Sequence, residues 1–235
     1  MTNKNGNEPF NKQDLKILSF IANTASVAIR NHQNRQMLEQ SYFDTVTALI
    51  MSLEARDEYT KGHSDRVTEY SVGIARQLQL EEEMIKTIKD AAILHDIGKI
   101  GVRDDVLLKP GRLTPEEFSE IKKHPVISGN IVKSISSLRE VGTIANQHHE
   151  RYDGKGYPDG LKDEEIHIGA RIMAVADIYD AMTSNRSYRK ALDPDYAVKE
   201  IKNQAGAQFD PQCVEAFLQY LTEKKTTENK PASAT

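Results

Sequence analysis

The chain has 235 residues and a formal net charge of −4, from 31 Lys and Arg against 35 Asp and Glu, with seven His and one Cys. No apolar run approaches the roughly 18 residues of a membrane-spanning helix, and the composition is not collagen-like. The single Cys213 excludes an intrachain disulfide and a zinc site of several cysteines. We therefore expect a cytoplasmic protein of one domain plus an appendage, without membrane insertion or a surface for duplex nucleic acid, in which His and carboxylate side chains hold any metal.

The N-terminal part is predicted to be a short disordered segment, residues 1–10, followed by a long helix. Apolar residues there recur at steps of three and four without Gly or Pro, beginning with Leu15, Leu18, Ile21 and Ala25. The pattern extends to residue 54, as one helix or as two helices with a joint. We assign residues 11–41 to a connector helix whose apolar side chains pair with those of a second copy, which predicts a homodimer.

The rest of the chain is predicted to be an all-α bundle, because its periodic segments are short and helical and none alternates like a strand. One helix start is well marked: Thr114 is an N-cap residue, Pro115 suits the first helical position and Glu117 completes a capping box. A Gly-rich loop is expected over residues 153–163 and a disordered tail over residues 222–235. Further helices are expected at residues 125–136, 138–149, 168–183, 194–204 and 211–222.

The densest cluster of reactive residues is the string HDIGK. His95 and Asp96 are adjacent, and Lys99 follows three residues after the aspartate. Adjacent side chains on a helix point about 100° apart, so one residue can face a metal while the two oxygens of Asp96 reach between that metal and a second. The apolar residues 91–94 would bury this cluster, and buried polar groups need metal coordination or mutual pairing.

Other candidate ligands are spread along the chain: His63, His124, the pair His148 and His149, and Asp177. Asp177 stands in the apolar helix RIMAVADIYDAM, where a carboxylate needs a metal or a cation as its partner. A salt bridge with Arg171 or Arg186 is the alternative. Taken alone, His63 is as readily a capping or exposed residue. Two further histidines are expected to be ordinary capping or surface residues: His32 and His167.

HDIGK together with HHERYDGKGYP resembles the signature of the HD-GYP family, a subgroup of the HD metal-dependent phosphohydrolases. The resemblance covers residues 42–221 and includes GHSDRV, LKPGRLTPEEFSEIKKHP and GARIMAVADIYDAMTSNRSYRKA in the same order. It implies an all-α fold, a helical HD-domain bundle with a Gly-rich GYP loop, here preceded by the connector helix. The connector itself is similar to the last helix of a GAF domain, which implies an upstream sensory domain.

The family resemblance implies a metal-dependent phosphodiesterase that hydrolyses cyclic di-GMP to linear pGpG through a hydroxide that bridges two metals, and further cleavage to GMP stays open. Tyr59 stands where some members have a glutamate that helps hold a third metal, so two metals are expected. Imidazole and carboxylate ligands without thiolate fit iron or manganese, with zinc, cobalt and nickel as alternatives. The implied ligands, with Asp96 shared between the two metals, are His63, His95, Asp96, His124, His148, His149 and Asp177.

The same resemblance implies that Lys99 binds a phosphate or stabilises developing negative charge. Further substrate contacts are implied at Gly156, Tyr157, Asp180, Arg186 and Arg189. For the GYP loop the alternative is structural, with glycines that close a tight turn and a tyrosine that packs. Two other functions stay open: a phosphodiesterase for cyclic GMP-AMP, and a non-catalytic cyclic-dinucleotide sensor or partner-binding module. Catalysis is favoured over sensing because all seven ligand positions are filled.

Overall fold

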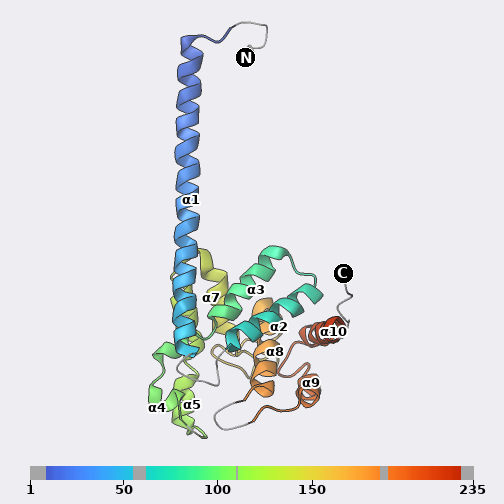
Figure 1. Cartoon of the computed structure of the whole chain (residues 1–235). Coiled ribbons are helices and arrows are strands. Elements are labelled where there is room, and N and C mark those ends of the chain that lie inside the picture. Colours follow the sequence, from blue (N-terminus) through green and yellow to red (C-terminus); the bar gives the residue numbers. More distant parts are fainter. Residues whose placement is uncertain (1–8, 55–61, 110, 186–189, 229–235) are drawn as a thin grey trace. The chain divides into compact units, whose positions relative to one another are not determined.

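The computed structural model describes residues 9–54, 62–109, 111–185 and 190–228 (Figure 1). In these ranges every regular element is a helix, and the only bridges between extended residues are two isolated ones, Asp153 with Lys162 and Ala205 with Phe209. The predicted all-α fold is therefore confirmed. The chain divides into two compact units, Met1–Thr45 and Val46–Thr235. No helix in the described ranges is both long and apolar enough to cross a bilayer.

Helix α1, Lys12–Glu54, is one continuous helix without the joint that the sequence left open. The side chain of Asn11 accepts hydrogen bonds from the backbone N–H of Gln13 and Asp14, which satisfies two of the donors at the helix start. The second unit begins at Val46, four residues after the boundary at residue 42 that we predicted. The apolar side chains of the first unit are exposed, for example Leu15, Leu18 and Ile21 at 64%, 63% and 57%.

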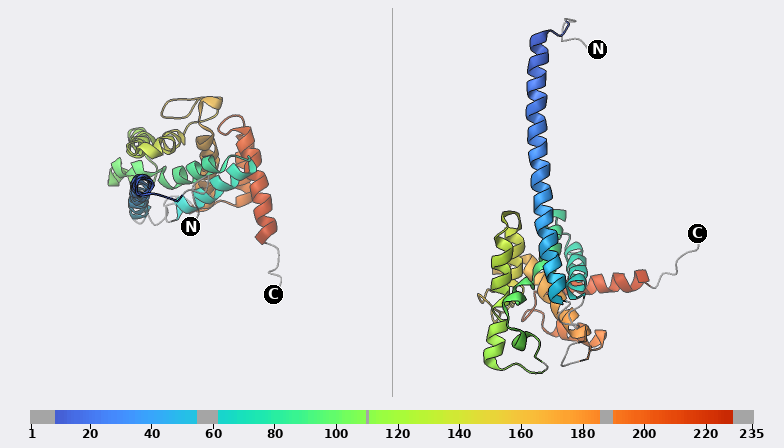
Figure 2. Two further views of the ribbon diagram at one scale, coloured as in Figure 1. Left: turned by 90° about the horizontal axis from the view of Figure 1, so that it is seen from above. Right: turned by 60° about the vertical axis from the view of Figure 1, so that its left-hand side comes forward.

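The second unit is built around helix α8, Ile168–Thr183. Five consecutive residues of α8, from Ile172 to Ala176, are buried, as expected for a helix that is surrounded by others. It packs against helices on several sides (Figures 1 and 2). These neighbours are α2 (His63–Gln77), α3 (Glu82–Leu94), α7 (Arg139–Gln147), α9 (Pro194–Asn203) and α10 (Pro211–Glu228).

The shorter elements join these helices. The capping box of α5, Pro115–Ile121, is present as predicted, since Thr114 and Glu117 each accept the backbone N–H of the other. Helix α6, His124–Lys133, packs on α7. The remaining short elements are η1 (Ile97–Gly101), α4 (Asp104–Leu107), η2 (Ser136–Leu138) and η3 (Asp163–Glu165).

Helix α10 continues to Glu228, whereas we predicted disorder from residue 222 onwards. The extension has a local cause in contacts with Glu69 of α2. Tyr220 donates a hydrogen bond to the Glu69 carboxylate at 3.1 Å, and the Lys224 ammonium pairs with the same carboxylate. The last turns of α10 project from the bundle (Figure 2).

Candidate metal centre

The predicted ligands converge from the ends of several helices. His63 is the first residue of α2, His95 follows the last residue of α3, and His124 is the first residue of α6. The pair His148 and His149 follows α7, and Asp177 lies inside α8. His95 and Asp96 lie in the turn between α3 and η1, rather than on a continuous helix as we assumed.

Three groups of these side chains could hold a metal ion, because within each group the ligand atoms all lie within 4.8 Å of one another. Every side chain in the three groups is buried or half-buried. The groups are His63, His95 and Asp177; His124, His148 and His149; and His95, Asp96 and His148.

Three imidazoles are oriented in the same way, each by a backbone carbonyl three residues earlier. His95, His124 and His148 donate from Nδ1, which leaves Nε2 with the lone pair that binds a metal. The acceptors are the carbonyls of Ala92, Ile121 and Ala145, at 2.7, 2.8 and 2.7 Å. Nε2 of His95 is buried and makes no hydrogen bond with the part of the chain that the structure describes. A buried nitrogen without a partner is costly, so this observation fits a metal ligand.

His63 is oriented by a carboxylate instead. Its Nδ1 donates to Asp180 at 2.7 Å, and Nε2 faces Asp177 Oδ1 at 3.4 Å and Asp96 Oδ2 at 3.7 Å. Arg66 donates to both oxygens of Asp180, from Nε at 2.5 Å and from Nη2 at 3.1 Å. These two hydrogen bonds and that of His63 lower the pKa of Asp180 to about 2, although burial acts in the opposite direction.

We predicted Asp180 as a substrate contact, and this stays a prediction. Its side chain is 1% exposed, and both oxygens are engaged by protein donors. Arg66 was not among the residues predicted for the site. The spacing carried a usable signal, since Arg66 follows His63 by three residues and Asp180 follows Asp177 by three, so each pair shares a helix face.

Asp96 lies between the groups of imidazoles. Its Oδ2 is 3.4 Å from His95 Nε2 and 3.7 Å from His63 Nε2, while its Oδ1 is 3.3 Å from His124 Nε2. Lys99 Nζ is 2.6 Å from Oδ2. One oxygen of Asp96 thus faces His63 and His95, and the other faces His124. A ligand that is shared between two metals requires this geometry.

The charges in the cluster are set by burial and by these neighbours. Burial disfavours the ionised form of Asp96, but Lys99 and His95 outweigh it and hold the pKa of Asp96 well below its usual range. Burial holds the pKa of His148 well below its usual range and lowers that of His149 to about 3. Near neutral pH the cluster therefore contains an ionised carboxylate and two neutral imidazoles, which are the forms that bind metals.

Asp177 has no arginine partner among the described residues. Arg171, one of the two alternatives, forms a 2.5 Å ion pair with Asp210 instead, and Arg186 lies outside the described residues. The pKa of Asp177 is lowered, because His63 and His149 outweigh the effect of burial. The interpretation of Asp177 as a metal ligand is favoured over the salt bridge.

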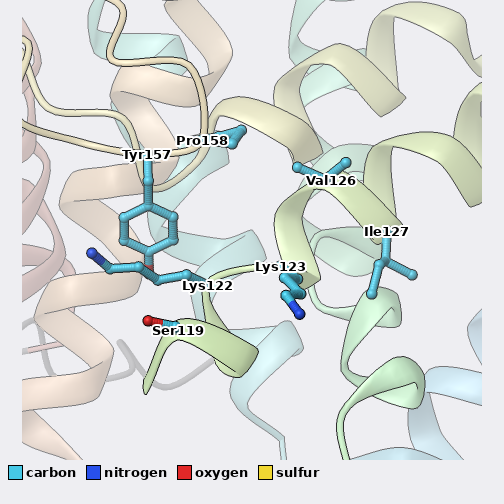
Figure 3. A pocket seen from close by; sticks show the side chains of 7 residues that line it. All are labelled: Ser119, Lys122, Lys123, Val126, Ile127, Tyr157 and Pro158. Carbon is cyan, nitrogen blue, oxygen red and sulfur yellow. The ribbon is translucent and has the colours of Figure 1, made fainter. Parts of the chain in front are cut away.

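The GYP loop reaches the cluster through Tyr157, whose ring centroid is 4.9 Å from that of His149. Tyr157 also lines a pocket of about 520 Å³ beside the cluster, with Lys122 Nζ 5.1 Å from its ring centroid (Figure 3). A Cβ at Gly156 would lie 2.3 Å from the backbone nitrogen of Arg151, so this close approach requires a glycine, and the predicted substrate contact of Gly156 stays a prediction. Tyr59, Arg186 and Arg189 lie outside the described residues.

Glu150 shapes this loop and was not among the residues predicted for the site. Its side chain is buried, and its carboxylate accepts three backbone N–H groups from the loop. The donors are Asp159, Gly160 and Leu161, at 2.7, 3.1 and 3.1 Å. A glutamate directly after the histidine pair and before a Gly-rich loop was the available signal.

The other two histidines are placed as predicted. His32 is exposed on α1. His167 caps α8, since its Nδ1 accepts from the backbone N–H of Gly169 at 3.0 Å. The site therefore contains five of the seven histidines.

Comparison with known proteins decides the family. A model of the HD domain matches residues 47–213. The chain belongs to the HD domain family. This confirms the predicted resemblance to HD-GYP proteins, whereas the GAF-like connector precedes the matched residues and stays a prediction.

The HD domain is similar to curated proteins from several bacteria. It is 44% identical over 183 residues to the cyclic di-GMP phosphodiesterase response regulator RpfG of Xanthomonas campestris pv. campestris. That match covers 77% of this chain and 48% of the relative. It is 45% identical over 192 residues to a cyclic di-GMP phosphodiesterase of Thermotoga maritima, in a match that covers 81% of this chain and 52% of the relative. The chain thus spans about half the length of these relatives.

A solved structure is similar as well. The crystal structure of a cyclic GMP-AMP specific phosphodiesterase of Vibrio cholerae, V-cGAP3, is 32% identical with a TM-score of 0.50. The match covers 83% of this chain and 43% of that one.

Proposed function

We propose that the protein is a metal-dependent phosphodiesterase that hydrolyses cyclic di-GMP to linear pGpG and, in a second cleavage, to GMP. The observation that carries this proposal is the position of Asp96, with one oxygen facing His63 and His95 and the other facing His124. Two relatives at 44% and 45% identity are named for the same activity, which supports the choice of substrate.

The residues present fit two divalent cations. We assign the first to His63, His95, Asp96 and Asp177, and the second to Asp96, His124, His148 and His149. Neutral imidazoles and carboxylates without thiolate fit iron or manganese, with zinc, cobalt and nickel as alternatives that metal reconstitution ranks. Bound divalent cations supply Lewis acidity toward phosphate oxygens and lower the pKa of water.

Hydrolysis to pGpG forms a P–O bond from water and breaks the bond between phosphorus and the 3′ oxygen, which takes up a proton.

Two side chains near the proposed metal centre are assigned to binding and orienting the substrate, Lys99 and Tyr157. We assign Lys99, which is ion-paired with Asp96, to binding a phosphate oxygen and balancing its negative charge. Tyr157, beside His149, offers a ring on which a guanine stacks.

A second candidate substrate is cyclic GMP-AMP. The similarity to V-cGAP3 favours it, since that protein is named for this activity. Both substrates carry the same phosphodiester group, so the proposed metal centre serves either one. A non-catalytic sensor is disfavoured because the seven proposed ligands converge within three metal-sized groups.

The test of this function is metal removal and reconstitution. The protein stripped with a chelator is expected to lose its hydrolysis of cyclic di-GMP and to regain it with Fe²⁺ under anaerobic conditions or with Mn²⁺. Chromatography identifies pGpG and GMP, and a parallel assay with cyclic GMP-AMP ranks the two substrates by kcat/KM. Tight binding of cyclic di-GMP without turnover under every metal would identify a sensor.

We also propose that the protein is a homodimer through α1. The exposed side chains of Leu15, Leu18 and Ile21 form part of an apolar stripe that a second copy can cover. Light scattering at tens of micromolar is expected to give about twice the chain mass of 26.4 kDa. Replacing Leu18 and Ile21 with glutamate is expected to give monomers. A wild-type monomer at this concentration contradicts the proposal.

A further inference from the structure

The end of helix α1 is hydrogen-bonded to the residues on either side of His63. Glu54 is the last residue of α1, and its carboxylate accepts the backbone N–H of Gly62 at 3.1 Å and that of Ser64 at 2.9 Å. Glu54 is half-buried, and Ile50, one helical turn earlier, is buried at 3% exposure. The end of α1 is therefore held in the same packed unit as the candidate metal centre.

The start of α2 depends on this carboxylate. The first N–H groups of a helix lack acceptors within the helix and need an outside partner. The N-cap residue of α2 is Gly62, with φ 70°, and it has no side chain that could accept them. Glu54 supplies both the acceptor atoms and a negative charge at the positive end of the helix.

His63 is therefore fixed at two places. Asp180 fixes the orientation of its ring, and Glu54 fixes the backbone N–H groups of the residues before and after it. Imidazole nitrogens bind metals at about 2.0–2.1 Å, and functional sites tolerate displacements of only about 0.5 Å. A shift of the α1 end that breaks the two hydrogen bonds would therefore misplace Nε2 of His63.

We propose that Glu54 is a positioning residue for His63 and that it couples the end of α1 to metal binding. The proposal rests on the proposed function only in taking His63 as a metal ligand. It assigns α1 a regulatory effect: a rotation or axial shift of its last turn changes the metal affinity of the site that contains His63.

The experiment compares Glu54→Ala and Glu54→Gln with a matched control, Asp193→Ala, in the full chain. Asp193 also accepts two backbone N–H groups at a helix start, those of Asp195 and Tyr196, but its helix α9 carries none of the proposed ligands. Each protein is stripped of metal and titrated with Co²⁺, whose visible absorption reports the ligand geometry. Thermal melting of the stripped proteins measures stability separately.

Glu54→Ala is expected to weaken binding of one Co²⁺ by about tenfold or more and to alter its absorption spectrum, because outer partners of metal ligands typically contribute about 10–100-fold in affinity. Glu54→Gln retains one acceptor oxygen and is expected to fall between Glu54→Ala and wild type, and it serves in place of Glu54→Ala should that variant fail to fold. Asp193→Ala is expected to lower the melting temperature while binding Co²⁺ like wild type.

Two results would overturn the inference alone. One is wild-type Co²⁺ affinity in both Glu54 variants, and the other is an equal loss of affinity in Asp193→Ala, which would make the effect one of general stability. A wild-type protein that binds no Co²⁺, Mn²⁺ or Fe²⁺ would overturn the proposed function together with the inference.

Discussion

Replacing Asp96 with alanine is expected to lower the turnover of cyclic di-GMP by at least about a thousandfold. The substitution removes the carboxylate that faces both groups of imidazoles, and with it the shared ligand of the two proposed cations. Metal ions in such sites contribute several kcal/mol to transition-state stabilisation, and about 4 kcal/mol corresponds to a thousandfold. Product formation is measured with excess Mn²⁺, alongside the bound metal content.

Asp105→Ala is the control for this variant. Asp105 pairs with the neighbouring Arg103 on the surface and belongs to none of the three candidate metal groups. Its replacement is expected to leave turnover and metal content within about twofold of wild type, as for most surface substitutions. Asp96→Ala with wild-type turnover and a full metal complement would contradict the assignment of Asp96.

Replacing Asp180 with alanine is expected to lower the free energy of unfolding by about 1–3 kcal/mol, because it removes a buried carboxylate that is ion-paired with Arg66, whose side chain is 35% exposed and therefore partly screened by solvent. It also frees the ring of His63, so metal affinity is expected to fall by about 10–100-fold. Urea unfolding of the stripped protein measures the first effect, and metal titration measures the second.

A matched pair outside the site separates the two effects. Arg171 and Asp210 form a 2.5 Å ion pair in which the Asp210 side chain is 2% exposed. Asp210→Ala is expected to lose a similar amount of stability and to keep its metal affinity. Equal losses of metal affinity in Asp180→Ala and Asp210→Ala would show that Asp180 acts through stability alone.

The contribution of Asp180 to stability should depend on pH in a defined direction. Its hydrogen bonds to His63 and Arg66 lower its pKa from 3.8 to about 2, against the effect of burial. A carboxyl group whose pKa is lower in the folded state adds stability that is fully present above its ordinary pKa and is lost as pH falls toward the lowered value. The difference in stability between wild type and Asp180→Ala is therefore expected to shrink between about pH 4 and pH 2.

Most helices could be predicted because their local signals agree with their burial. Helix α8 has the bounds that its apolar run predicted, and the capping box marked the start of α5. The end of α10 could not be placed in this way, because the residues after Leu221 are polar. Their order depends on a contact with Glu69, which lies far away in the sequence.

The candidate site could be predicted in its ligand types but not in its supporting contacts. Histidines and aspartates at unusual positions are visible in a single sequence, and the structure brings together all seven that we predicted. A sequence does not show which carboxylates are engaged by protein donors, as Asp180 is by His63 and Arg66. Glu54 and Glu150 both accept backbone N–H groups, a contact that a sequence does not show, although the position of Glu150 between the histidine pair and the Gly-rich loop was a usable signal.

The anchoring of His95, His124 and His148 to backbone carbonyls has a consequence for how this site tolerates sequence change. A carbonyl is present whatever residue occupies Ala92, Ile121 or Ala145, so point substitutions there do not delete the acceptor. A one-residue insertion or deletion within α3 or α7 is different, because it rotates the following residues by about 100°. Homologous sequences should therefore keep the three-residue spacing to each histidine fixed, whereas the buried positions Ala92 and Ala145 are limited by packing and not by the hydrogen bond.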